Sequence, residues 1–392
     1  MEYFCILLFL LIGVFRYDFY NHCYYRKVYF YFISILLFSL SAFSYRIGVN
    51  DVIAYMSEYD LSQPLTHTHF AELFGNFNRR PAWNILIALC KDVCNDYVVY
   101  KIIHAFFVNF TIIYFLRCYS SKIFIALLLY FLTFYSIFNF DIMRESLAAC
   151  CFIWALHYYR QNKWLKYYLW TILATQFHIS ALFLFFIPIL KLIPVTKRLL
   201  IVSIFLILFC LCVYPYVNNF FMALGALEQM GSFGDKAVGY LSREEYKGVV
   251  TLGSIFKSLS LNAIPPFIIM WYYIKEKRIE EYWLIPLVII FVIISILNIS
   301  TPIFYRFLNY FWIIYVLLIT DACDNLLHVN MRVLQRQLVV ITLIFLTIYR
   351  PIKVKFLPSP ENPNVPIYTY YYPYYSVFSK YTDRKREAIR VY

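Results

Sequence analysis

Arg144 and His178 are the residues of this chain whose types are best suited to chemistry. They lie 34 positions apart in segments that are otherwise largely apolar, Asp141-Ile-Met-Arg-Glu145 and Gln176-Phe-His-Ile-Ser180. An ionisable group at bilayer depth costs roughly 2.5 kcal/mol or more, so it persists mainly where pairing, water or function compensates it. A guanidinium is a permanent bidentate donor for phosphate, and a histidine can accept a proton near neutral pH. The pair therefore predicts a polar reaction site.

Other ionisable residues are predicted to face the same side of a membrane as this pair. They are Arg46, Asp51, Arg79, Arg80, Glu145 and Arg306. Several arginines with a general base and no evident metal cage suit glycosyl transfer from a lipid diphosphate, because the arginines stabilise the charge that grows on the leaving group. We expect Arg144 and Arg306, with Arg46 and Arg80, to bind the diphosphate. We expect His178 to be the base, with Asp51 or Glu145 as the alternative.

Each candidate also has an ordinary structural explanation. Arg144 and Glu145 can end a helix at the membrane interface, and His178 can be a hydrogen-bonded core histidine. Arg80 and Arg306 can anchor loops to lipid headgroups. The pair His67-Thr-His69 lacks an evident third ligand, and the ten cysteines lie mostly in apolar runs without zinc or redox spacing. We therefore predict no metal and no cofactor.

The composition defines the fold class that must position these residues. The chain of 392 residues is 62% hydrophobic and 22% aromatic. Apolar runs that are continuous and non-alternating predict membrane-spanning helices of about 20 residues each. We predict an all-α, polytopic membrane bundle of about 10–12 transmembrane helices. The predicted spans are 3–15, 28–45, 102–116, 123–140, 147–159, 199–215, 259–274, 283–299, 307–320 and 338–349.

The segment 167–190 is long enough to cross the membrane once, but its flanking charges argue otherwise. Basic clusters stand on both sides of it, at 160–166 and at 191–198. Lys and Arg favour cytoplasmic connections, so the chain should return to the side from which it came. We predict a short helical hairpin with His178 at its apex.

The distribution of charge predicts the orientation. With this hairpin, sixteen Lys or Arg fall in the inner connections and two, Arg144 and Arg306, in the short outer loops. The net charge of +13 is scattered between spans in short clusters, which argues against a nucleic-acid partner. We predict one transmembrane domain over 1–350, with long outer loops at about 46–101 and 216–258. A Pro- and Tyr-rich basic tail, 351–392, falls on the outer side and is expected to lie at the membrane interface.

Four segments resemble motifs of the EpsG-like family of Wzy-type exopolysaccharide and O-antigen polymerases. The family's opening outer loop resembles Ser44-Tyr-Arg46-Ile-Gly48-Val-Asn50-Asp51 with Tyr55, and its Arg-Gln-x-x-Ala segment resembles Arg144-Glu145-Ser-Leu-Ala148. Its Phe-His-x-Ser-Ala segment resembles Phe177-His178-Ile-Ser180-Ala181, and a later Arg-aromatic element resembles Tyr305-Arg306-Phe307. The chain departs from the family at Glu145, where Gln is usual, at Asn50, where a small residue is expected, and at Arg80-Pro81-Ala-Trp83, where Glu commonly precedes Pro.

The resemblance implies a metal-independent, inverting glycosyltransferase. It would polymerise undecaprenyl-diphosphate-linked oligosaccharide repeats into capsule, O-antigen or exopolysaccharide on the outer face of the bacterial inner membrane. The expected partners are that lipid-linked substrate and membrane lipid, with a flippase and a chain-length regulator. Two alternatives remain open. One is a glycosyltransferase that uses a lipid-monophosphate sugar, in which Glu58 and Asp60 would act with a metal, and the other is a lipid-linked oligosaccharide flippase or transporter.

Overall fold

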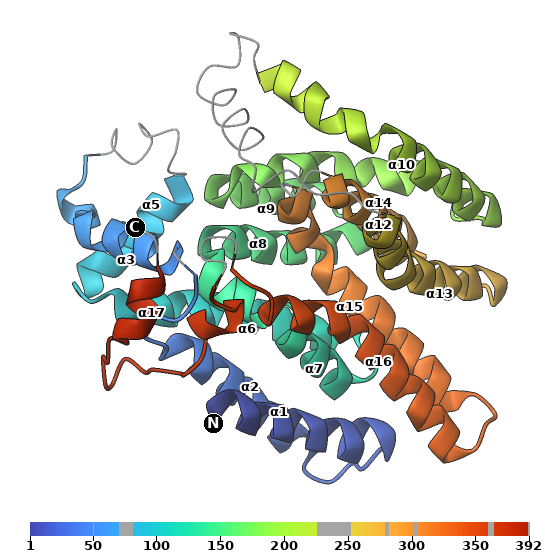
Figure 1. Ribbon diagram of the computed structural model, residues 1–392, viewed down its shortest axis with the longest axis horizontal. Helices are drawn as coiled ribbons and strands as arrows, with labels where there is room; N and C mark the ends of the chain where they lie inside the picture. The colour runs from blue at the N-terminus through green and yellow to red at the C-terminus, as the bar shows by residue number, and fades with distance from the viewer. Residues whose placement is uncertain are drawn as a thin grey trace. The chain divides into compact units, whose positions relative to one another are not determined.

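The protein is all-α over the part of the chain that the structure describes, with no β-strand there. A computed structural model covers residues 1–392 and describes 1–49, 51–69, 81–225, 252–278, 282–300, 304–359 and 364–390 (Figure 1). This confirms the predicted fold class. The chain divides into two compact units, one formed by Met1–Phe185 with Ile319–Tyr392 and the other by Phe186–Leu318.

The helices of the first unit carry most of the predicted site. They are α1 (Glu2–Gly13), α2 (Arg26–Ala42), α3 (Asp51–Leu61), α5 (Pro81–Val93), α6 (Tyr97–Tyr119), α7 (Ile123–Thr133), α8 (Met143–Arg160), α9 (Trp164–Phe177), α16 (Val333–Lys355) and α17 (Arg384–Ile389), with π-helical turns η1 (Val14–Phe19) and η3 (Ile137–Asp141) and 3₁₀ turns η2 (Leu65–His67) and η10 (Ile367–Tyr370). The second unit holds α10 (Lys197–Gly225), α12 (Leu252–Ser258), η7 (Leu259–Ala263), α13 (Ile264–Lys275) and α14 (Leu284–Ser300). The 3₁₀ helix η4 (Ile179–Leu192) and α15 (Tyr305–His328) run from one unit into the other.

Helix α7 is the centre of the first unit. Its residues from Ile123 to Phe131 are all buried, as expected of a helix that is apolar on every side. Helices α1, α6 and α16 pack around it. Helix α7 is therefore the buried centre around which these three helices pack.

Three described helices are long and apolar enough to cross a membrane: α6, α15 and α16. The first predicted span, 3–15, is divided between two elements. Helix α1 continues without a break into the π-turn η1, because Gly13 and Val14 keep right-handed helical dihedral angles. A predicted span can therefore be one apolar run even where the helix changes its hydrogen-bonding pattern.

Polar contacts join the connections after α1 and α6 to the C-terminal part of α15 at one end of the first unit. The Lys122 ammonium donates to the Asp18 carbonyl at 3.0 Å and to the Asn21 side chain at 2.9 Å, and it lies 3.5 Å from the Asp324 carboxylate. Asp18 also accepts a hydrogen bond from the Ile125 backbone N–H at the start of α7, at 2.8 Å. These connections are among those that the charge pattern assigned to the inner side.

The chain reverses direction at His178, as predicted for the hairpin. His178 ends α9 in an extended conformation, with φ −149° and ψ 132°. The Tyr167 hydroxyl donates to the Leu184 carbonyl at 2.6 Å, and the Tyr168 and Phe185 rings stack 6.0 Å apart. Had η4 continued straight on from α9, about 28 Å would separate these positions, so the contacts require the second segment to fold back.

Candidate active site

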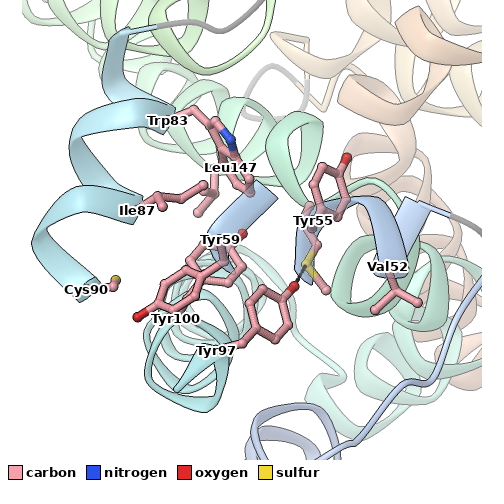
Figure 2. Close-up of a cluster of buried hydrophobic side chains, with 10 residues drawn as sticks. Val52, Tyr55, Tyr59, Trp83, Ile87, Cys90, Tyr97, Tyr100 and Leu147 are labelled. Carbon is pink, nitrogen blue, oxygen red and sulfur yellow. Dashed lines mark hydrogen bonds between the residues drawn. The ribbon is translucent and has the colours of Figure 1, made fainter. Parts of the chain in front are cut away.

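An aromatic cluster lies between α3, α5, α6 and the start of α8. Its buried members are Val52, Tyr55, Tyr59, Trp83, Ile87, Cys90, Tyr97, Tyr100, Met143 and Leu147 (Figure 2). The Trp83 ring packs 5.3 Å from the Tyr55 ring and 5.2 Å from the Tyr100 ring. Rings at these separations attract each other beyond their buried area. The cluster is therefore a closely packed aromatic platform, formed by the rings of Tyr55, Trp83 and Tyr100, at the end of the bundle where α8 begins.

Arg144 lies over this platform, in the first turn of α8. Its guanidinium carbon is 5.6 Å from the centre of the Tyr55 ring and 5.8 Å from that of Trp83, within the range of a cation–π interaction. Its Nε atom is buried and has no hydrogen-bond partner among the described residues. A buried donor without a partner is costly, so this atom marks a position where an anionic ligand would be stabilised.

Acidic side chains face Arg144 from α3. Asp51, Tyr55 and Glu58 recur at helical spacing along one face of α3, and both carboxylates interact electrostatically with Arg144. Burial raises the pKa of the Tyr55 hydroxyl, so this group stays neutral. Glu145 is buried, with 3% of its surface exposed, in the first turn of α8. The two predicted alternative bases, Asp51 and Glu145, thus lie close to Arg144.

His178 is connected to the same cluster through the residue that precedes it. Phe177, the residue before it, packs against the cluster from α9. The His178 Nδ1 atom accepts a hydrogen bond from the Ser180 backbone N–H at 3.3 Å, and the Ser180 hydroxyl lies 2.6 Å from the same atom. The backbone bond requires an unprotonated Nδ1, which puts the proton of the neutral ring on Nε2. The structure therefore brings Arg144 and the hairpin apex to one aromatic cluster.

Arg46 contacts the C-terminal tail. Its Nε and Nη2 atoms donate to the two carboxylate oxygens of Glu387, at 3.0 and 2.6 Å. Both side chains are largely shielded from solvent, with 22% and 16% exposed. A planar guanidinium on a carboxylate is a strong paired contact. The part that sequence reasoning gave to Arg46, diphosphate binding, stays a prediction.

Asp141 is an organising residue that sequence reasoning did not assign. One of its carboxylate oxygens accepts the Val49 backbone N–H at 3.0 Å, and the other accepts the Tyr371 hydroxyl. It thereby ties the entry of α3 and the tail to the residues just before Arg144. The signal in the sequence was a carboxylate in an apolar run, and its two partners lie 92 and 230 residues away.

The remaining predicted site residues lie in the second unit or outside the described residues. Arg306 is the second residue of α15 and lies in the second unit, with its guanidinium 6.0 Å from the centre of the Tyr305 ring. Arg79, Arg80 and Asn50 fall outside the described residues. No group of three or more His, Cys, Asp or Glu side chains within the described ranges is arranged to hold a metal ion.

Comparison with known proteins gives one match at the level of family. The family model described as the EpsG family matches residues 27–381, which is nearly the whole chain and includes every candidate site residue. No curated protein and no solved structure matches. The match confirms the family suggested by the four sequence motifs.

Proposed function

The chain belongs to the EpsG family of membrane polysaccharide polymerases, and we propose that it transfers a growing glycan from a lipid diphosphate to the next lipid-linked repeat. The observation that carries this proposal is the Arg144 guanidinium. It lies on the Tyr55 and Trp83 rings and has a buried Nε donor without a described partner. Such a donor suits an oxygen of the leaving diphosphate.

In the proposed reaction, a hydroxyl of the acceptor sugar attacks the anomeric carbon of the donor glycan. The new C–O bond forms as the bond from that carbon to the lipid diphosphate breaks, with inversion of configuration. Arg144 stabilises the charge that develops on the leaving diphosphate. Its position in the first turn of α8 adds the positive end of the helix dipole.

The proton of the acceptor hydroxyl passes to His178 in this proposal. The ring nitrogen that can accept it is Nδ1, which faces Ser180. The Ser180 hydroxyl, 2.6 Å from Nδ1, is placed to take the acceptor's proton as it gives its own to the ring. Asp51 and Glu145 remain the alternative bases, because both lie near Arg144.

The proposal extends to the location and the partners. The protein would act on the outer face of the bacterial cytoplasmic membrane on undecaprenyl-diphosphate-linked oligosaccharide, after a flippase and together with a chain-length regulator. The contacts of the tail support this sidedness. The tail contacts the connection after α2, and its Lys380 binds Asp96 at the start of α6. This is the opposite end of α6 from the one where Lys122 meets Asp18 and Asp324.

Reconstitution tests the proposed function. Purified protein in liposomes should convert outward-facing lipid-diphosphate-linked repeats into a ladder of longer products, resolved by size. Transport of the repeats without growth would show a flippase instead. Activity that requires a lipid-monophosphate sugar, stops with EDTA and fails in Asp60→Ala would identify the other transferase class.

A further inference from the structure

The tail from residue 364 to 390, which we call the clasp, is joined to the connection between α2 and α3. The Tyr45 backbone N–H donates to the Tyr375 carbonyl at 2.8 Å, and the Gly48 N–H donates to the Tyr370 carbonyl at 3.1 Å. A Val377 N–H bond to the Phe43 carbonyl, at 2.9 Å, extends the contact. Figure 1 shows α17 beside α3 at this end of the first unit.

Charged side chains lock the same contact. The Glu387 carboxylate accepts hydrogen bonds from the Arg46 Nε and Nη2 atoms and, at 2.7 Å, from the Arg390 Nη1 atom. The Arg390 Nη2 atom donates to the carbonyls of Arg46 and Gly48, both at 2.9 Å. One carboxylate thus joins two arginines, and one of these, Arg390, holds the backbone carbonyls of Arg46 and Gly48.

The held connection has an unusual backbone. Arg46 has φ +49° and Gly48 has φ +121°, both in the left-handed half of the conformational map. Residues other than glycine keep such angles mainly where the surrounding contacts determine them. The clasp supplies these contacts, and α3 begins three residues after Gly48.

We propose that Glu387 is a positioning residue of the active site, acting through Arg46. The clasp fixes residues 46 to 49, which set the direction of α3 and hold Tyr55 against the Arg144 guanidinium. The Glu387 carboxylate accepts from the Arg46 Nε and Nη2 atoms, which form the bidentate edge that would otherwise suit a phosphate. This inference rests on the proposed function and assigns Arg46 to the clasp, in place of diphosphate binding.

A charge exchange tests the inference. The variants Arg46→Glu and Glu387→Arg should each lower polymer formation about 10–100-fold, the size expected when a distant change misplaces a catalytic group. The double variant should recover part of the lost activity, because the pair between positions 46 and 387 is restored with reversed charges while the Arg390 contact to the Glu387 carboxylate stays lost. If Arg46 instead binds the diphosphate, the double variant stays as inactive as Arg46→Glu, and the inference is wrong.

Two further measurements keep the result interpretable. Glu387→Gln should fold and should lower kcat more than it raises KM, whereas Lys380→Ala, which removes an exposed tail contact to Asp96, should leave the rate near wild type. Equal losses in both would show that the tail is only a general support. Amide exchange at Gly48 and Val49 is independent of catalysis. It should speed up in Glu387→Gln and slow again in the double exchange relative to Arg46→Glu, and unchanged exchange in Glu387→Gln would overturn the clasp even if no polymer forms.

Discussion

The guanidinium carbon of Arg144 lies 5.6 Å from the centre of the Tyr55 ring, although the two residues are 89 positions apart. This contact connects α8, which begins at the bundle's end, to α3, whose entry is held by the tail. It gives Arg144 a fixed place on an aromatic surface, with a buried Nε donor that has no hydrogen-bond partner among the described residues.

Arg144→Lys should reduce polymer formation by about 10²-fold or more, the loss seen when one donor to a developing charge is removed. Lysine keeps the charge but lacks the planar, bidentate donors and their stacking on Tyr55 and Trp83. The rate of product growth in liposomes measures the effect. Arg160→Lys, at the opposite end of the same helix, is the matched control, and similar losses in both would contradict a specific role for Arg144.

His178→Ala should abolish polymer and leave single lipid-linked repeats to accumulate, because the proposed base is removed. Ser180→Ala should give a smaller loss, since it removes the hydroxyl that lies 2.6 Å from Nδ1. Sizing of extracted lipid-linked glycans reads out both variants. The control is His157→Ala in the last turn of α8, far from Arg144, whose ring lies 2.6 Å from the Tyr119 hydroxyl. Polymer of normal length in His178→Ala would exclude the assignment.

Trp83→Ala should lower the free energy of unfolding by about 3–5 kcal/mol, the usual cost of removing a buried aromatic side chain. The Trp83 side chain is fully buried and supports both Tyr55 and Arg144. Thermal or denaturant unfolding in detergent measures the change. Leu89→Ala on the same helix is the control, because that side chain is 46% exposed.

Gly48→Ala should destabilise the protein by roughly 1–2 kcal/mol or more, because residues with a Cβ avoid left-handed angles. A Cβ atom at this position would also come within 2.9 Å of the Asp141 Oδ1 atom and of the Phe140 carbonyl oxygen. Unfolding measurements should show a loss much larger than that of Ser57→Ala on the exposed face of α3. Equal losses of stability in the two variants would mean that the connection between α2 and α3 accommodates a Cβ atom at position 48 without strain.

The contact of the tail with Asp96 should weaken only in acid. The hydrogen bond from Lys380, followed by that from the Val98 N–H, holds the pKa of Asp96 below its ordinary value. A lowered folded-state pKa stabilises the fold fully above the unfolded value of about 3.9, and this contribution is lost as the pH falls through the folded value. The stability difference between wild type and Asp96→Asn should therefore be present at pH 6 and shrink below about pH 4. A difference that stays constant into acid would contradict the assigned contact.

The sequence by itself determined the class of the molecule and the broad position of its chemistry. The apolar runs predict membrane helices because the bilayer requires long apolar segments, and the basic clusters around 167–190 predict the reversal at His178 that Tyr167 and Leu184 confirm. Four short motifs were enough to suggest the family. These signals are local, so each can be recognised without knowledge of the partners.

Only the tertiary structure decided which side chains meet. Glu387 is 341 residues from Arg46, and no periodicity or spacing links a basic, irregular tail to one arginine near the second helix. Tyr55 and Trp83 became the support of Arg144 because α3 and α5 pack beside the start of α8, which depends on the summed packing of the whole unit. Sequence reasoning assigned Arg46 to the substrate because several arginines on one side of a membrane suit a phosphate, and only the fold shows that its guanidinium pairs with the Glu387 carboxylate.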